Sequence, residues 1–133
     1  MNWDDREKYD AAEPQDMIGK TMASVEQQKN DGGDSLVFTC DDGTTYLFEH
    51  DQDCCESVRI EDIAGDLEDL VGSPLVQSEG VTSSDADKPD EWSDSWTWTF
   101  FKFATAKGYV TVRWLGESNG YYSESVDMYK SKS

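Results

Sequence analysis

The segment with the sequence HDQDCCE, residues 50–56, holds the chain's single histidine together with two of its three cysteines. His50 could act as the base that activates the thiol of Cys54 or Cys55, because the thiolate is the reactive form of cysteine. The neighbouring carboxylates work against this chemistry, since nearby negative charge disfavours a thiolate. A cysteine-dependent enzyme is therefore the third of three hypotheses for this chain.

The same segment also offers ligands for a metal ion. Zinc could use the histidine, the two cysteines and a carboxylate, but adjacent cysteines suit one tetrahedral ion less well than a C-x-x-C spacing does. Calcium could use the carboxylates of Asp51, Asp53 and Glu56, but the segment lacks the glycine and the spacing of an EF-hand. We therefore expect no metal and no other cofactor. The favoured interpretation is structural, with one cysteine packed inward and His50 bonded to a local backbone group.

Aromatic side chains in the last third of the chain suggest a second kind of chemistry, the stacking of a nucleotide or a sugar. They are Trp92, Trp96, Trp98, Trp114, Tyr121 and Tyr122. Arg113, Lys102 and Asn119 are close to them in sequence and could bind the polar groups of such a ligand. Alternating aromatic residues on antiparallel strands more often form core and cross-strand pairs. We therefore expect most of them in the core, and a small-ligand-binding module is the second hypothesis.

The charge of the chain suggests a different function. The chain has 29 acidic and 11 basic residues, a net charge of -18. Such a charge repels nucleic acid and anionic membranes, and DNA binding depends largely on Lys and Arg. It also exceeds the net charge of about 2–8 that keeps a small domain soluble. A partner with a basic surface is therefore expected, with a merely solubilising surface as the alternative.

The carboxylates are concentrated in two stretches of the chain. Residues 49–69 contain nine acids and one base, and residues 79–94 contain six acids and one base, whereas residues 95–133 contain five bases and three acids. A row of carboxylates on a convex surface resembles the phosphates of a nucleic acid. The leading hypothesis is therefore a nucleic-acid mimic, an interaction protein that blocks the basic, nucleic-acid-binding surface of a host defence nuclease or another nucleic-acid-processing protein. The predicted partner-binding residues are Asp51, Asp53, Glu56, Glu61, Asp62, Asp66, Glu68, Asp69, Asp85, Asp87, Asp90, Glu91 and Asp94.

Several classes of protein are disfavoured by what the sequence lacks. It contains no P-loop, Rossmann glycine pattern, G-x-S-x-G or H-E-x-x-H motif, so we predict that the protein is not an enzyme. Its apolar runs are too short to span a bilayer, and its acidic amino terminus does not fit a signal peptide. Three cysteines do not make a disulfide framework, which favours a cytoplasmic location.

The elements that position these residues are predicted to be mostly strands. Asp42-Gly43 predicts a type I′ turn between strands at residues 36–39 and 45–48. Alternation of apolar and polar residues predicts a short strand around Val58 and Ile60. Asp66 is a suitable cap for a single helical turn that ends near Leu70.

The last third of the chain is predicted to form a three-stranded antiparallel sheet, from residues 96–103, 109–115 and 121–128. The acidic residues 1–17 are predicted to be a tail, and residues 18–133 a single domain. The expected fold class is α+β, mostly antiparallel β, with one short helix.

The chain also resembles a small family of uncharacterised proteins from bacteriophages and bacteria. The resemblance covers residues 18–128 and is carried by IGKT (18–21), DDGTTY (41–46), HDQDCCESV (50–58), EDIAGDLEDLVGSP (61–74), WTWTF (96–100) and GYVTVRWLGESNGYYSESV (108–126). The HDQDCCE and SNGYYSE segments are its most specific parts. The resemblance assigns no catalytic residue. It implies a phage-encoded accessory protein that acts on a host system in the host cytoplasm.

Overall fold

The computed structural model describes residues 8–30, 33–50, 55–83 and 94–131, and in these it is nearly all β. Nine strands and two 3-10 turns are present, and the described residues contain no α-helix. The strands are β1 (Tyr9–Ala11), β2 (Met22–Asn30), β3 (Gly33–Cys40), β4 (Thr45–Glu49), β5 (Ser57–Ala64), β6 (Gln77–Ser83), β7 (Ser95–Thr105), β8 (Gly108–Ser118) and β9 (Asp127–Ser131), and the turns are η1 (Pro14–Met17) and η2 (Leu67–Leu70). The predicted α+β class with one short helix is therefore wrong.

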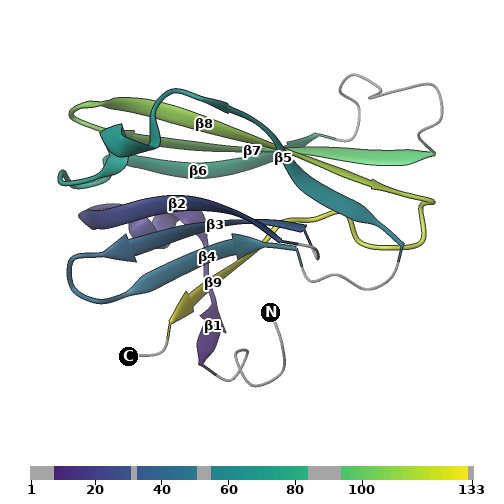
Figure 1. Cartoon of the computed structure of the whole chain (residues 1–133), viewed down its shortest axis with the longest axis horizontal. Helices are drawn as coiled ribbons and strands as arrows, with labels where there is room; N and C mark the ends of the chain where they lie inside the picture. The colour runs from purple at the N-terminus through teal and green to yellow at the C-terminus, as the bar shows by residue number, and fades with distance from the viewer. Residues whose placement is uncertain (1–7, 31–32, 51–54, 84–93, 132–133) are drawn as a thin grey trace.

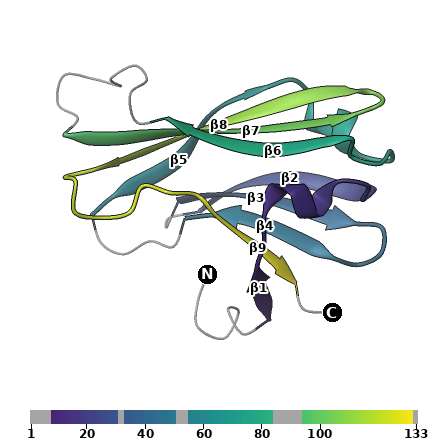
Figure 2. The ribbon, with the colours of Figure 1, turned by 180° about the vertical axis from the view of Figure 1, so that it is seen from behind.

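Two antiparallel sheets face each other as two layers (Figures 1 and 2). One has the strand order β1-β9-β4-β3-β2 and the other the order β5-β8-β7-β6. Aromatic rings from both sheets meet between the layers, with ring centroids 4.8 Å apart for Phe48 and Phe101 and 4.9 Å apart for Phe38 and Phe103. Because such rings bury a large area each, a chain with few aliphatic residues still forms a core.

Strand β7 shows how the sequence alternation produces this layer. Phe101 and Phe103 point into the core and are buried, while Phe100 and Lys102 lie on the outer face. On the paired strand β8, Val110, Val112 and Trp114 are fully buried. The predicted alternation of these two strands is confirmed.

The turn between β3 and β4 differs in type from the prediction. The amide of Gly43 donates to the carbonyl oxygen of Cys40 over 3.1 Å, and Gly43 has a φ of 91°. No residue other than glycine has a positive φ in the described parts of the chain. A type I′ turn needs positive φ at both central positions. The geometry is instead a type I turn followed by a left-handed glycine, and the Asp42 carboxylate accepts from the amide of Thr44.

The last strand belongs to the other sheet. Strand β9 pairs with β4 and β1, for example through Leu47 opposite Tyr129, and has no pairing with β8. Residues 119–126, here called the tyrosine loop, carry the chain from the four-stranded sheet to the five-stranded sheet. The predicted three-stranded carboxy-terminal sheet is therefore wrong, and only its β7–β8 pair exists.

The folded part begins earlier than the predicted boundary at residue 18. Strand β1 pairs with β9, with Tyr9 opposite Ser131, and Met17 at the end of η1 has no exposed surface. Residues 1–7 lie outside the described residues. At least residues 9–17 are thus part of the sandwich rather than of a tail.

A further segment closes one side of the sandwich. In η2 the Asp66 carboxylate accepts from the amide of Glu68 over 3.0 Å, which confirms the predicted cap, although the turn is 3-10. Residues 71–75 then bond to the start of β2, with the Gly72 amide donating to Met22 and the Leu75 amide to Lys20. Strand β5 is an edge strand of its sheet and leads directly into η2 (Figure 1).

Candidate functional site

Seven of the thirteen carboxylates predicted to bind a partner lie in the described part of the chain. They are Glu56, Glu61, Asp62, Asp66, Glu68, Asp69 and Asp94. The other six, Asp51, Asp53, Asp85, Asp87, Asp90 and Glu91, lie outside the described residues, as do Cys54 and Trp92. The geometry can therefore be judged for the stretch from 55 to 69 and for Asp94.

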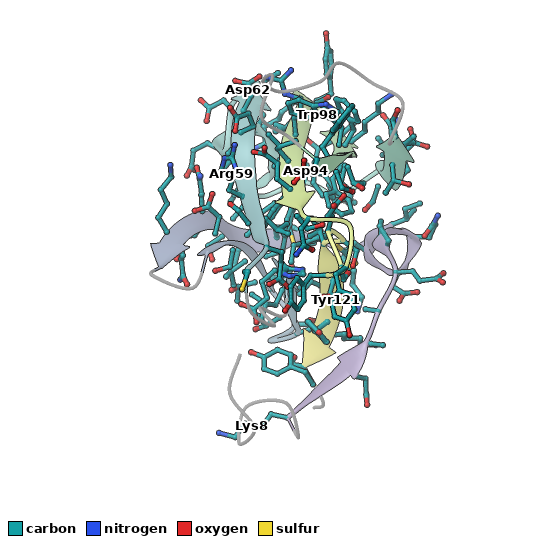
Figure 3. All side chains as sticks on the ribbon, turned by 90° about the vertical axis from the view of Figure 1, so that its right-hand side faces the viewer. Lys8, Arg59, Asp62, Asp94, Trp98 and Tyr121 are labelled. Carbon is teal, nitrogen blue, oxygen red and sulfur yellow. The ribbon has the colours of Figure 1, made fainter. Side chains whose placement is uncertain are left out.

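A β-bulge on β5 determines where two of these acids point. Ile60 lies opposite Trp114 and Asp62 lies opposite Arg113, so Glu61 is an extra residue in the strand. A bulge redirects the side chains next to it. Glu61 and Asp62 are consequently both exposed, although neighbours on a regular strand point to opposite faces. Figure 3 looks at this end of the sandwich, where Asp62, Arg59 and Asp94 are labelled.

A shallow pocket lies beside the bulge, between the edge strands of the two sheets. It is lined by Gln27, Lys29, Ile60, Glu61, Asp62 and Ile63. Beyond it, Asp66 and Glu68 are exposed and Asp69 is half-buried. Glu61, Asp62, Asp66, Glu68 and Asp69 form a continuous run along an edge strand and the turn after it, and they are called the acidic edge below.

Only part of the acidic edge is neutralised by nearby cations. Arg59 donates from Nε to Glu61 over 3.2 Å and from a terminal nitrogen to Glu117 over 2.8 Å. No ion pair joins Asp62, Asp66 or Glu68 to another described residue. Asp94 is also exposed, at the start of β7. Within the described part of the chain, most of the acidic edge is therefore left without an ion pair.

The prediction that Glu56 belongs to the acidic surface is wrong, because its side chain has no exposed area. Its Oε2 lies 2.8 Å from Nε2 of His50, whose side chain is also buried. The other ring nitrogen, Nδ1, lies 2.7 Å from the carbonyl oxygen of Ser125. Ser125 is distant in sequence, so His50 does bond a backbone group, but not the local one that was predicted.

This arrangement leaves His50 without a free nitrogen for acid–base chemistry. Cys55 is disulfide-bonded, so it presents no thiolate, and Cys40 is a free thiol in the core with its Sγ 3.6 Å from Sδ of Met22. Burial raises the pKa of the Cys40 thiol, which makes it a poor nucleophile. Within the described ranges, no three His, Cys, Asp or Glu side chains are grouped as they would be around a metal ion.

The aromatic residues divide between the core and the outer face of the four-stranded sheet. Trp114 is fully buried between the sheets. Trp98 is also buried, with 9% exposed, but it lies on the other face of its sheet, where the guanidinium carbon of Arg113 is 4.9 Å from its ring centroid. Trp96 is half-buried on the same face, and Lys102 is exposed. The direct contact between Arg113 and Trp98 could not be predicted from sequence spacing, because the two residues are on different strands.

The two tyrosines are in the tyrosine loop and not on a strand. Their rings meet edge to face with centroids 5.1 Å apart, and Tyr121 is 84% exposed. Figure 3 shows Tyr121 at the same end of the sandwich as Asp94. Asn119 accepts from the amide of Tyr121 over 2.9 Å, so its side chain serves the loop's own backbone.

The fold and this surface define a small antiparallel β-sandwich protein with an acidic edge strand. The chain belongs to the family described as Domain of unknown function (DUF7448), whose model matches residues 15–128. This match agrees with the resemblance to an uncharacterised family. It does not indicate a phage origin, and it does not single out the HDQDCCE and SNGYYSE segments. No curated protein and no solved structure matches the chain. In the described residues we find no helix of the length and hydropathy that crossing a membrane requires.

Proposed function

We propose that this protein is an interaction protein whose acidic edge binds a basic surface of another protein. The observation that carries the proposal is the β-bulge on β5, which exposes Glu61 and Asp62 side by side next to the carboxylates of η2. Of these acids, only Glu61 has an ion-pair partner among the described residues. Carboxylates that no described cation of the chain neutralises can be neutralised by Lys and Arg of a partner.

A nucleic-acid-binding surface is the kind of partner that this charge fits best. Such surfaces carry clustered Lys and Arg to neutralise phosphates, and a protein of net charge -18 offers them negative charge of the same sign as the phosphates. Opposite potentials accelerate association and make it sensitive to salt. We further propose that the partner is a nuclease or another nucleic-acid-processing protein of a bacterial host, that the chain is phage-encoded, and that binding blocks the partner in the host cytoplasm.

The test is a capture experiment with a matched charge control. Tagged wild-type protein and the variant Asp62→Lys/Asp66→Lys/Glu68→Lys are incubated with bacterial lysate, and bound proteins are quantified by mass spectrometry at low and high salt. The control Glu13→Lys/Asp16→Lys/Glu26→Lys makes the same change in charge at residues that are not part of the acidic edge. All three of its positions are exposed in the structure.

The proposal predicts that wild-type protein and control capture basic nucleic-acid-binding proteins, that double-stranded DNA competes with them, and that the acidic-edge variant does not capture them. If both variants capture the same proteins equally well, the position of the carboxylates does not matter. The charge would then serve only as a solubilising surface. Capture that survives high salt and DNA would also contradict the proposal.

A second candidate, a small-ligand-binding module, is favoured by the state of Arg113. Its Nε is enclosed without a hydrogen-bond acceptor, and no described residue forms an ion pair with it, although Asp62 lies opposite on β5. Together with Trp98 it could hold a nucleotide by stacking and charge. In this case a nucleotide should raise the melting temperature of the wild type and not of Arg113→Ala, and the absence of any shift in the wild type would exclude the module.

A further inference from the structure

We propose that two copies of this protein form a symmetric dimer through the outer face of the four-stranded sheet. All described strands belong to the two sheets, and this face is turned away from the five-stranded sheet (Figures 1 and 2). On β7 the core residues Phe101 and Phe103 alternate with Phe100, Lys102 and Ala104, which therefore lie on the outer face. The strand register extends this face to β6, β8 and β5.

Large apolar side chains are exposed on this face. Val81, opposite Phe100, is 51% exposed, and Tyr109, opposite Ala104, is 77% exposed. Val76 is 67% exposed just before β6, where its amide donates to the carbonyl oxygen of Ala104 over 2.9 Å. The outward positions of a sandwich usually carry polar side chains, and exposed apolar side chains that lie together mark an interaction surface.

The charges on this face balance, although the whole chain has a net charge of -18. The register places six charged residues there, three basic and three acidic: Arg59, Lys102, Arg113, Asp62, Glu79 and Glu117. Glu61, as the extra residue of the β-bulge, is outside this register. The registered positions of the face therefore have no excess of negative charge.

Four of these charged residues can find an opposite charge on a second copy. Asp62 lies across from Arg113 and Glu79 across from Lys102, but none of the four forms an ion pair with a described residue. A copy of the same face presents both signs of charge together with apolar side chains, which is the self-complementarity that a two-fold interface requires. A basic partner would instead meet its own sign of charge at half of these positions.

Dimerisation through this face should depend on salt in the opposite sense to binding at the acidic edge, which lies at the border of the face on β5. Two chains of net charge -18 repel each other, and salt screens this repulsion without weakening the burial of apolar side chains. The affinity of the dimer should therefore increase with salt, whereas the affinity for a basic partner should decrease. The two outer faces should pack about 10 Å apart, as stacked sheets do.

Sedimentation equilibrium of the full chain measures the dimer directly. Wild-type protein is compared with Val81→Lys/Tyr109→Lys, which places two lysines on each face, at about 0.05 M and 0.5 M sodium chloride. The control Gln28→Lys/Tyr121→Lys makes the same change in net charge at exposed positions of β2 and the tyrosine loop. Circular dichroism shows whether each variant keeps the β fold.

The wild type and the control should dimerise, and more tightly at the higher salt concentration. The dissociation constant of the Val81→Lys/Tyr109→Lys dimer should rise at least about a hundredfold, since each substitution acts twice in a two-fold interface. A folded variant that dimerises as tightly as the wild type, or a wild-type dimer that weakens with salt, would overturn the proposal. If the variant does not fold, a wild type that stays monomeric up to about 1 mM at both salt concentrations still overturns it.

Discussion

The carboxylate of Glu56 and the imidazole of His50 meet at 2.8 Å in the interior, at the two ends of the segment whose residue types first suggested chemistry. Both side chains are essentially inaccessible to solvent. Removing Glu56 is costly, because Nε2 of the buried His50 then loses its hydrogen-bond partner. The HDQDCCE segment is thus anchored at both ends by one contact.

This contact predicts a large effect of truncation at Glu56. Glu56→Ala should lower the free energy of unfolding by about 3–5 kcal/mol, the usual cost of leaving one member of a buried pair alone. Urea denaturation followed by tryptophan fluorescence measures the change. Glu68→Ala, at an exposed position, should stay within about 0.5 kcal/mol of the wild type. Similar values for the two variants would show that the His50–Glu56 contact contributes little to stability.

The packing of η1 predicts that the amino-terminal region contributes to the core. Met17→Ala removes a side chain with no exposed surface and should cost about 2–5 kcal/mol in the same assay. Gln15→Ala, in the same turn but exposed, is the control and should have little effect. An unchanged unfolding midpoint for Met17→Ala would mean that residues 9–17 are a tail after all.

The hairpin between β3 and β4 predicts an acid-sensitive contribution to stability. The pKa of Asp42 is held well below its usual range, mainly by the hydrogen bond that Lys20 donates to its carboxylate over 2.8 Å. The hydrogen bond from the Thr44 amide lowers the pKa further. A carboxyl whose pKa is lowered on folding stabilises the protein above its unfolded pKa, and this stabilisation is lost as the pH falls through the folded pKa. The difference in stability between wild type and Asp42→Asn should therefore be constant above about pH 5 and shrink below about pH 4.

Denaturation midpoints at several pH values measure this difference. Asp41→Asn, a neighbouring exposed position, changes the net charge equally and serves as control. A difference between wild type and Asp42→Asn that is independent of pH would contradict the assignment of the Lys20 contact.

The environment of Cys40 predicts that its thiol is inert in the folded protein. Its side chain is 2% exposed, and burial raises its pKa, so the neutral thiol predominates at neutral pH. In a Cys54→Ser/Cys55→Ser background, a disulfide reagent should label Cys40 only as fast as the protein unfolds, and at once in concentrated urea. Immediate labelling without urea would show that β3 is not packed as described.

The local sequence pattern was sufficient to predict the strands that pair with the next strand along the chain. The alternation of aromatic residues from Trp96 to Phe103 identified β7, because each side chain there is either in the core or on the outer face. The cap at Asp66 was also predictable, since it depends on residues two positions apart.

Long-range pairing could not be predicted in the same way. The sequence from Tyr121 to Met128 has strand-forming residues directly after β8, which favours a hairpin. The chain instead leaves the sheet at the tyrosine loop, and β9 fills the position between β1 and β4. Glu56 was predicted to be a surface carboxylate, because the prediction rested on the number of acids in this stretch. The only sign of a buried pair in the sequence was His50 at the other end of the same segment.

We propose that the acidic edge, and not the total charge, binds a basic partner. The most direct measurement is the dissociation constant of a captured partner for the wild type and for Asp62→Lys/Asp66→Lys/Glu68→Lys, at about 0.05 M and 0.5 M salt. The wild type should bind with an affinity that weakens strongly with salt, and the variant should not bind under either condition. Equal dissociation constants for the two proteins would contradict it.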